Sequence, residues 1–334
     1  MAFIEVAHLT KTFRRRVRPK GSLAGLRWIT TRSYEETAAL TDVGFTIEAG
    51  EAVGYIGPNG AGKSTTVKCL TGILVPTSGS VRVGGLVPWK DRLAYVRGIG
   101  VVFGQRSQLQ WDLPLADSLD FLQYVYDLPP DAFRRSLAEL TAALDLEPFL
   151  RVPVRQLSLG QRMRGDLAAS LIHRPRILFL DEPTIGLDLV AKDQLRRMLQ
   201  DAHRNLGVTV FLTSHDLADV EALCDRILVV DGGRVVYDGS QASFRRRYGG
   251  PRVLVVTLRH AEPVRLGAGV ACAQEENRVR IPLEEGVDAP ALMGELLSRH
   301  AVADFALEEP ALEDSVRRVY QTRTPPLPTV PASR

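Results

Sequence analysis

Two patterns of apolar residues alternate along roughly the first 240 positions. Short, mostly apolar runs at Ala52–Ile56, Ile177–Leu180 and Val208–Leu212 predict buried strands. Lys63–Leu70 follows the first run directly and predicts a helix. Because strands and helices alternate in this way, we expect an α/β domain with a mostly parallel sheet over residues 1–240.

A long helical segment interrupts this alternation. Residues 105–172 have helical periodicity broken by prolines such as Pro114 and Pro148, which predicts a helical subdomain inserted into the sheet. Further on, Asp231-Gly232-Gly233 separates two valine-rich runs and predicts a hairpin that closes the large domain.

The segments after the large domain, and one insertion within it, have a different residue composition. Residues 250–320 predict a small α+β domain, and the proline-rich end, residues 321–334, predicts a disordered tail. Residues 14–36 form an insertion that mixes basic residues with Trp28 and aliphatic ones. Such an insertion can contact a membrane or a partner, or it can be a solvated mobile loop, and both interpretations stay open.

Composition narrows the class of protein. The 42 Lys and Arg against 39 Asp and Glu give a net charge of +3, which excludes a strongly basic nucleic-acid coat or an acidic disordered tail as the main identity. No apolar run approaches 18 residues, and Glu5 comes too early for a signal peptide. Three scattered cysteines indicate a reducing compartment and no structural metal. We therefore expect a cytoplasmic chain.

A glycine-rich loop carries the strongest chemical signal. The run is Gly57-Pro58-Asn59-Gly60-Ala61-Gly62-Lys63-Ser64-Thr65. It fits G-x-x-x-x-G-K-[ST] and lies directly between a predicted strand and a predicted helix. Its backbone N–H groups and the helix N-terminus suit phosphate oxygens, Lys63 reaches the β- and γ-phosphates, and the Ser64 hydroxyl ligates Mg²⁺. The loop predicts binding of ATP or GTP.

Two carboxylates end a later apolar strand. Asp181 and Glu182 follow Ile177–Leu180 directly. An aspartate at this place holds the Mg²⁺ shell, and a second carboxylate can polarise the attacking water, which a nucleotide binder without hydrolysis does not need. Taken alone, acidic residues at a strand end are common. Beside a phosphate loop they predict hydrolysis.

Three further sequence features are weak evidence of function when each is taken alone. Leu157-Ser158-Leu159-Gly160-Gln161 precedes a helix, where Ser158 also suits a helix N-cap. His215 follows the third strand and can meet a γ-phosphate, although a lone histidine is more often structural. Gln105 follows the strand Ile99–Phe103 and can bind water or metal, but alone it is an ordinary polar residue.

Together and in this order, these motifs resemble the nucleotide-binding subunit of an ABC transporter over about residues 3–238. The resemblance implies a P-loop NTPase fold and two such domains paired head to tail, with each ATP held between the loop of one and the Leu157–Gln161 signature of the other. The residues that would serve the chain's own ATP are Lys63, Ser64, Gln105, Asp181, Glu182 and His215.

The resemblance also assigns residues around the second ATP and the adenine. Ser158, Gly160 and Gln161 would contact the ATP of the partner, and Asp188 would communicate across the pair. Phe13 would stack on adenine, although the insertion follows it directly. Leu159 stands where the family usually has glycine, so we expect its side chain to point away from the nucleotide.

The details narrow the role that the resemblance implies. The segment from Val102 to Pro114 and the ending Pro310–Val316 look like the ATPases of bacterial drug and polysaccharide exporters, whose membrane subunits are separate chains. We expect an ATPase peripheral on the inner face of the membrane that uses ATP and Mg²⁺, works as a homodimer or heterodimer with transmembrane permease subunits, and binds no nucleic acid.

Two rival interpretations come from other classes. The first is a soluble ABC-type ATPase acting on ribosomes or DNA. Such relatives usually carry two ATPase units or a long coiled coil, whereas this chain has one phosphate loop and no sustained heptads. The second is a non-hydrolysing regulatory subunit, which the presence of both Glu182 and His215 disfavours.

Overall fold

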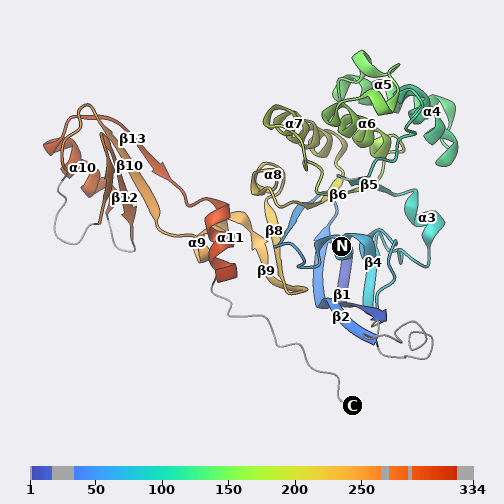
Figure 1. Ribbon diagram of the computed structural model, residues 1–334, viewed down its shortest axis with the longest axis horizontal. Helices are drawn as coiled ribbons and strands as arrows, with labels where there is room; N and C mark the ends of the chain where they lie inside the picture. The colour runs from blue at the N-terminus through green and yellow to red at the C-terminus, as the bar shows by residue number, and fades with distance from the viewer. Residues whose placement is uncertain (1, 17–33, 105, 265–270, 285–287, 322–334) are drawn as a thin grey trace, which may run out of the picture. The chain divides into compact units, whose positions relative to one another are not determined.

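The computed structural model describes residues 2–16, 34–104, 106–264, 271–284 and 288–321 (Figure 1). The chain divides into two compact units, Met1–Gly239 and Ser240–Arg334. The strands of the first unit are β1 (Ala2–Arg16), β2 (Tyr34–Glu48), β3 (Ala52–Ile56), β4 (Ser78–Val83), β5 (Ile99–Phe103), β6 (Ile177–Asp181), β7 (Thr209–Thr213), β8 (Arg226–Asp231) and β9 (Arg234–Ser240). Its helices are α2 (Lys63–Leu70), α3 (Arg92–Val96), α4 (Leu115–Val125), α5 (Pro130–Ala143), α6 (Leu159–Leu171), α7 (Leu189–Leu206) and α8 (Leu217–Leu223), with short 3₁₀ turns at Glu147–Phe149 and Val154–Gln156.

Among the described residues, six strands form the central sheet of the first unit. Their order is β5-β6-β7-β3-β8-β9, and the pairings of β5 with β6, β6 with β7, β7 with β3 and β3 with β8 are all parallel. Every residue of β7 is buried, as expected for a strand covered on both faces. The predicted mostly parallel α/β fold is confirmed.

A second sheet of the first unit was not predicted. β1 and β2 form a long antiparallel pair, and β4 joins β1 on its other edge. Phe45 of this sheet packs against Tyr55 and Phe211 of the central sheet, with ring centroids 6.0 Å away in both cases. The main core of this unit therefore lies between the two sheets.

The outer ends of the predicted insertion at residues 14–36 belong to this hairpin. Arg14 pairs with Glu36 and Arg16 with Tyr34, and an ion pair joins Arg14 Nε to Glu36 Oε1 at 2.6 Å. Both strands thus continue into the ends of the predicted insertion. Residues 17–33 lie outside the described residues.

The helical segment after β5 is attached to the sheet at both edges. Figure 1 shows α4, α5 and α6 gathered on the side of the unit away from β1, β2 and β4. At the carboxyl edge, the Gly104 N–H donates to Asp181 O at 2.9 Å. At the opposite edge, His173 Nε2 donates to Ile99 O at 2.8 Å, and the His173 ring stacks on Tyr126 with a centroid distance of 3.9 Å. The segment is therefore connected to the sheet where it leaves and where it returns.

The second unit is a small α+β body. It comprises α9 (Gln241–Tyr248), β10 (Arg252–Leu258), β11 (Ala273–Glu275), β12 (Arg278–Leu283), α10 (Ala289–Arg299), β13 (Val302–Glu308) and α11 (Leu312–Gln321). The strands pair antiparallel in the order β11-β12-β10-β13, and Leu292 and Leu296 of α10 share a core with Val256 and Ile281. Beyond Gln321, the predicted tail lies outside the described residues.

Candidate functional site

The register of the central sheet brings three strand ends to one edge. Asp181, the last residue of β6, pairs with Phe103 on β5 and with Thr213 on β7. The residues that follow these strands therefore emerge together, at the carboxyl edge where parallel α/β sheets place their ligands. These residues include Gly104, Glu182 and His215.

The glycine-rich loop connects β3 to α2 beside this edge. Gly62 is the N-cap of α2 with φ +101°, and a Cβ at this residue would lie 2.6 Å from Ala39 O. Only glycine fits here, and Gly62 and the first residues of α2 line the adjoining cavity, where a helix start has N–H groups without helical partners. That cavity measures about 490 Å³ and is lined by Ala39, Asn59, Gly60, Gly62, Lys63, Ser64, Thr65, Glu182, Ile185 and His215.

Lys63 lies folded along the loop. Its side chain is only 7% exposed, and Nζ donates to Gly57 O at 2.7 Å and lies 3.9 Å from Glu182 Oε1. A buried ammonium group beside open helix N–H groups makes the floor of this cavity attractive to phosphate.

Oxygen donors gather beside Lys63. The Ser64 hydroxyl donates to Asp181 Oδ1 at 3.3 Å, and the Thr213 hydroxyl donates to the same oxygen at 2.6 Å. Mg²⁺ prefers one or two protein oxygen ligands that leave room for water and phosphate, and a hydroxyl with a carboxylate fits that need. In the part of the chain that the structure describes, no group of three or more His, Cys, Asp or Glu side chains is placed to hold a metal alone.

Glu182 and His215 face each other at the mouth of the cavity. Glu182 Oε2 lies 2.5 Å from His215 Nδ1 and also accepts the His215 backbone N–H at 3.1 Å. The Glu182 backbone has φ +55°, a left-handed conformation that is uncommon for a non-glycine residue. A carboxylate on a strained backbone, held by an imidazole beside a phosphate-binding loop, is suited to abstract a proton from a water molecule.

The loop after β5 is held tightly against Glu182. A Cβ at Gly104 would lie 2.0 Å from Glu182 O, so the close approach requires glycine. Gln105 itself lies outside the described residues. Two residues later, the Ser107 hydroxyl and the Gln108 N–H donate to Asp166 Oδ1 at 2.9 and 3.0 Å. Burial raises the pKa of Asp166 to about 6, opposed by these two hydrogen bonds.

The predicted signature forms the start of α6. Ser158 is its N-cap: the Ser158 hydroxyl accepts the Gln161 N–H at 3.2 Å, and Gln161 Oε1 accepts the Ser158 N–H at 2.9 Å. This capping box is the structural role that the local sequence predicted for Ser158. Ser158 is exposed and Leu159, Gly160 and Gln161 are half-buried, so the positive end of α6 is partly accessible.

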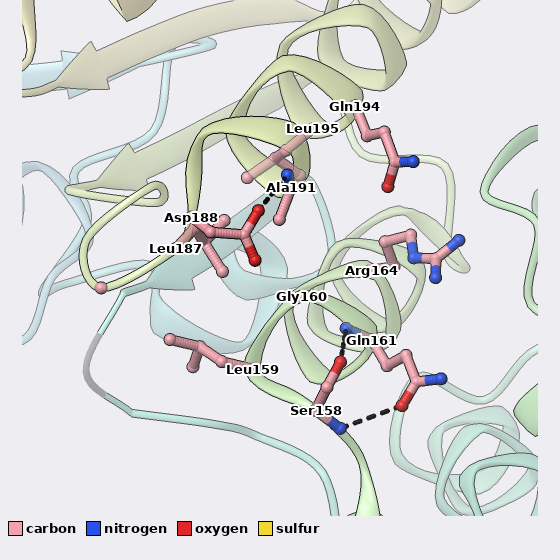
Figure 2. A pocket seen from close by; sticks show the side chains of 11 residues that line it. Ser158, Leu159, Gly160, Gln161, Arg164, Leu187, Asp188, Ala191, Gln194 and Leu195 are labelled. Atoms are coloured by element: carbon pink, nitrogen blue, oxygen red, sulfur yellow. Dashed lines mark hydrogen bonds between the residues drawn. The ribbon is translucent and has the colours of Figure 1, made fainter.

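A second cavity separates the signature from α7. It measures about 170 Å³, and Figure 2 shows Ser158, Gly160, Gln161 and Arg164 on one side with Asp188, Ala191 and Gln194 on the other. Asp188 caps α7 by accepting the Ala191 N–H at 2.8 Å. The Leu159 side chain lies toward Gly186, where a Cβ would be 3.2 Å from Leu159 Cδ2. The structure therefore brings Ser158, Gly160, Gln161 and Asp188 to a site apart from Lys63.

Phe13 lies on β1, the strand paired with β2, which contributes Ala39 to the cavity. It lies on β1 opposite Thr37, is 42% exposed and has Lys11 Nζ 5.3 Å from its ring centroid. It is not among the residues that line the 490 Å³ cavity, although Ala39, two residues beyond Thr37, is.

The site includes three residues that were not predicted from the sequence. Thr213, Ile185 and Ala39 contribute a hydroxyl and walls to the site. Thr213 is the last residue of β7, whose predicted end was Leu212. Its position directly before Ser214 and His215 was the signal in the sequence that could have placed it at the site. Ala39 belongs to the sheet that was not predicted, so no local pattern pointed to it.

The fold and the phosphate loop define the chain as a P-loop nucleotide-binding protein. The ABC transporter family profile matches residues 40–185. The daunorubicin resistance ATP-binding protein DrrA3 of Streptomyces coeruleorubidus is 34% identical over 296 residues, which cover 85% of this chain and 91% of that protein. The linearmycin resistance ATP-binding protein LnrL of Bacillus subtilis is 29% identical over 292 residues, 84% of this chain and 93% of that protein.

Solved structures agree. The structure of an ATP-binding subunit of an ABC transporter matches with a TM-score of 0.61 at 26% identity, over 74% of this chain and 93% of that one. A dimeric ATP-binding cassette in a post-hydrolysis state, bound to ADP and Pi, matches with a TM-score of 0.59 at 25% identity, over 71% and 98%. The chain belongs to the ABC transporter family as an ATP-binding subunit, and it is an ATPase.

Among the helices that the structure describes, none is both long enough and apolar enough to span a bilayer.

Proposed function

We propose that this chain hydrolyses MgATP to drive an exporter whose transmembrane subunits are separate chains, from the cytoplasmic face of the membrane. The observation that carries the catalytic part is the Glu182–His215 pair beside Lys63. A subunit that only bound ATP would not need a carboxylate held 2.5 Å from an imidazole at the mouth of the phosphate cavity.

The proposed roles follow from the chemistry of each group. Lys63 and the N–H groups at the start of α2 bind the β- and γ-phosphates, and Ser64 with Asp181 holds Mg²⁺. Bound Mg²⁺ neutralises charge that develops on the phosphate oxygens. Glu182 orients a water molecule and accepts its proton, while His215 fixes the Glu182 carboxylate. Gln105 is proposed to complete the Mg²⁺ and water shell.

A second ATPase subunit is part of this proposal. Arg164 lines the cavity at Ser158, Gly160 and Asp188, no lysine is among the described residues that line it, and the positive end of α6 forms part of its wall. Leu189 and Val190, which follow Asp188 directly, are 72% and 67% exposed. Apolar side chains at this degree of exposure support a protein contact, and we infer that the partner's ATP and its loop cover this side. Phe13 is proposed to stack on adenine.

The helical segment is the proposed contact with the membrane subunits. Trp111, Phe121 and Tyr124 are all exposed there, with Tyr124 79% accessible. Large aromatic residues at an accessible surface are typical of protein interfaces.

The direction of transport is inferred from the relatives that match the chain furthest. The two drug-resistance proteins match 84–85% of this chain and so extend into the second unit. The methionine import ATP-binding protein of Myxococcus xanthus matches 64% of the chain, and Nod factor export ATP-binding proteins match 63–65%, so a match to the first unit alone does not separate the two directions. Export is therefore supported by the drug-resistance relatives.

Two measurements test the proposal. The purified full chain should hydrolyse ATP only with Mg²⁺, and Glu182→Gln should abolish turnover while keeping ATP bound. Affinity purification from the native membrane should recover a multi-span membrane protein together with the chain. Recovery of ribosomes instead, with no membrane protein, would contradict the transporter assignment.

A further inference from the structure

Asp219 is a fully buried carboxylate behind the catalytic pair. It lies on α8, four residues after His215, and its side chain has no access to solvent. Burying a carboxylate is costly unless hydrogen bonds and an opposite charge compensate for the lost water. The role proposed for the site in the preceding subsection does not use Asp219.

Two of its hydrogen bonds join the segments that carry Glu182 and His215. Asp219 Oδ2 accepts the hydroxyl of Thr184, two residues after Glu182, and the hydroxyl of Ser214, directly before His215, the latter at 2.9 Å. Thr184 and Ser214 are themselves 1% exposed. One buried carboxylate therefore connects the two chain segments whose side chains meet at the cavity mouth.

The compensating charge comes from α7. Arg196 Nε donates to Asp219 Oδ1 at 2.7 Å, and Arg196 Nη2 donates to Asp216 Oδ2 at 3.3 Å. Lys192 Nζ, one turn earlier on α7, donates to the same oxygen of Asp216 at 2.6 Å. Because Asp188 caps this helix, the network runs from the signature cavity to the residues on both sides of His215.

We propose that Asp219 is a positioning residue: it fixes the His215 segment against the Glu182 segment and ties both to α7. The inference rests on the catalytic roles proposed for Glu182 and His215. The 2.5 Å Glu182–His215 contact depends on two short loops that follow different strands, and the Asp219 carboxylate bonds to both loops. A movement of α7 therefore reaches His215 through Arg196 and Asp219.

The first test is Asp219→Asn in the purified full chain. The amide removes the charge that Arg196 compensates and gives up one acceptor site. We expect kcat for MgATP to fall about tenfold to a hundredfold, as for a small misplacement of reacting groups, while KM for ATP changes little because Lys63 and the loop are untouched. Asp238→Asn is the matched control, since Asp238 also pairs with one arginine, Arg226, away from the site.

The second readout does not depend on turnover. The imidazole ¹⁵N resonances of His215, assigned with a His215→Gln variant, report its hydrogen bond to Glu182. Glu182→Ala, which has no acceptor at this position, defines the shift of the broken contact. We expect Asp219→Asn to move the His215 resonance toward that value and Asp238→Asn to leave it in place.

The outcomes separate this inference from the proposed function. A chain without ATPase activity refutes the proposed function, and the His215 resonance still decides whether Asp219 positions it. An unchanged resonance with unchanged kcat in Asp219→Asn overturns the inference. Should that variant not fold, Ser214→Ala removes one hydrogen bond and keeps the ion pair, and the same two readouts decide with smaller expected effects.

Discussion

Glu182 Oε2 and His215 Nδ1 lie 2.5 Å apart across the ends of two neighbouring strands. The same carboxylate oxygen accepts the His215 backbone N–H, so the histidine holds Glu182 by its ring and by its main chain. Lys63 lies 3.9 Å from the other oxygen. These contacts therefore fix the orientation of the carboxylate.

Replacing this carboxylate is the most direct prediction. Glu182→Gln keeps the size of the side chain but cannot accept a proton, so we expect the rate of ATP hydrolysis to fall by about 10²–10⁴-fold. ATP affinity, measured by equilibrium binding, should remain close to that of the unchanged chain. Glu139→Gln, which alters an exposed ion pair with Arg174, is the control and should keep full activity. Normal hydrolysis by Glu182→Gln would remove the role assigned to this residue.

Gly104 tests the packing behind the catalytic strand. An alanine Cβ would lie 2.0 Å from Glu182 O and 2.8 Å from Ile185 Cγ2, so the main chain after β5 or β6 must shift. We expect Gly104→Ala to lower the free energy of unfolding by roughly 1–3 kcal/mol and to reduce ATP turnover. Chemical denaturation and ATPase assays measure the two effects. Gly98→Ala is the control, because its nearest atom is 3.6 Å from the added Cβ. Equal behaviour of the two variants would contradict the close approach.

Asp166 predicts a pH dependence of stability. Burial raises its pKa to about 6 in the folded chain, from an ordinary value of 3.8. Between these two values the folded state binds more protons than the unfolded state, so the free energy of unfolding decreases as pH rises from about 4 to about 6 and levels off above that. The size of this term is roughly 1–3 kcal/mol.

Denaturation curves at several pH values check this sign. Asp166→Asn cannot ionise and should lose that part of the decline, whereas Asp201→Asn, at an exposed position of α7, should keep it. An unchanged pH profile in Asp166→Asn would show that Asp166 does not titrate in this range.

Leu159 and Gly186 give a prediction about the signature. Alanine at Gly186 meets two obstacles, a backbone with φ +78° and Leu159 Cδ2 at 3.2 Å. The backbone term alone is about 1–2 kcal/mol. We expect Gly186→Ala to lower stability and ATPase activity, and we expect the double variant Leu159→Ala/Gly186→Ala to recover the part due to the side-chain contact. A double-mutant cycle on both readouts measures it. Purely additive effects would mean that Leu159 does not bear on this loop.

Local patterns of apolar residues predicted well the strands that carry the candidate site. The predicted bounds of Ala52–Ile56 and Ile99–Phe103 agree with β3 and β5, because uninterrupted apolar runs between polar ends leave little ambiguity. The residues after these strands could be placed at one edge because parallel strands share their direction. Such reasoning could not find the β1–β2–β4 sheet, whose long strands carry register shifts and exposed polar residues that resemble loops.

Contacts between segments far apart in the chain also could not be predicted from local sequence patterns. Asp166 has the local signature of a polar residue in a helix, and only the fold shows that it is buried and accepts the Ser107 hydroxyl. Asp219 likewise reads as one acid among several after His215. Their partners lie 59 and 35 residues away, and a single sequence offers no periodicity that connects them.

The two attachments of the helical segment limit how it can move. Gly104 bonds to Asp181 at one edge of the sheet, and His173 bonds to Ile99 at the other. Helix α6 also packs directly on β5, where a Cβ at Gly100 would lie 2.3 Å from Ser170 O. Residues 107–171 are therefore not displaced independently of β5 and β6. In a transporter, a push on the exposed face of α4 would act on the two strands that precede Gly104 and Glu182.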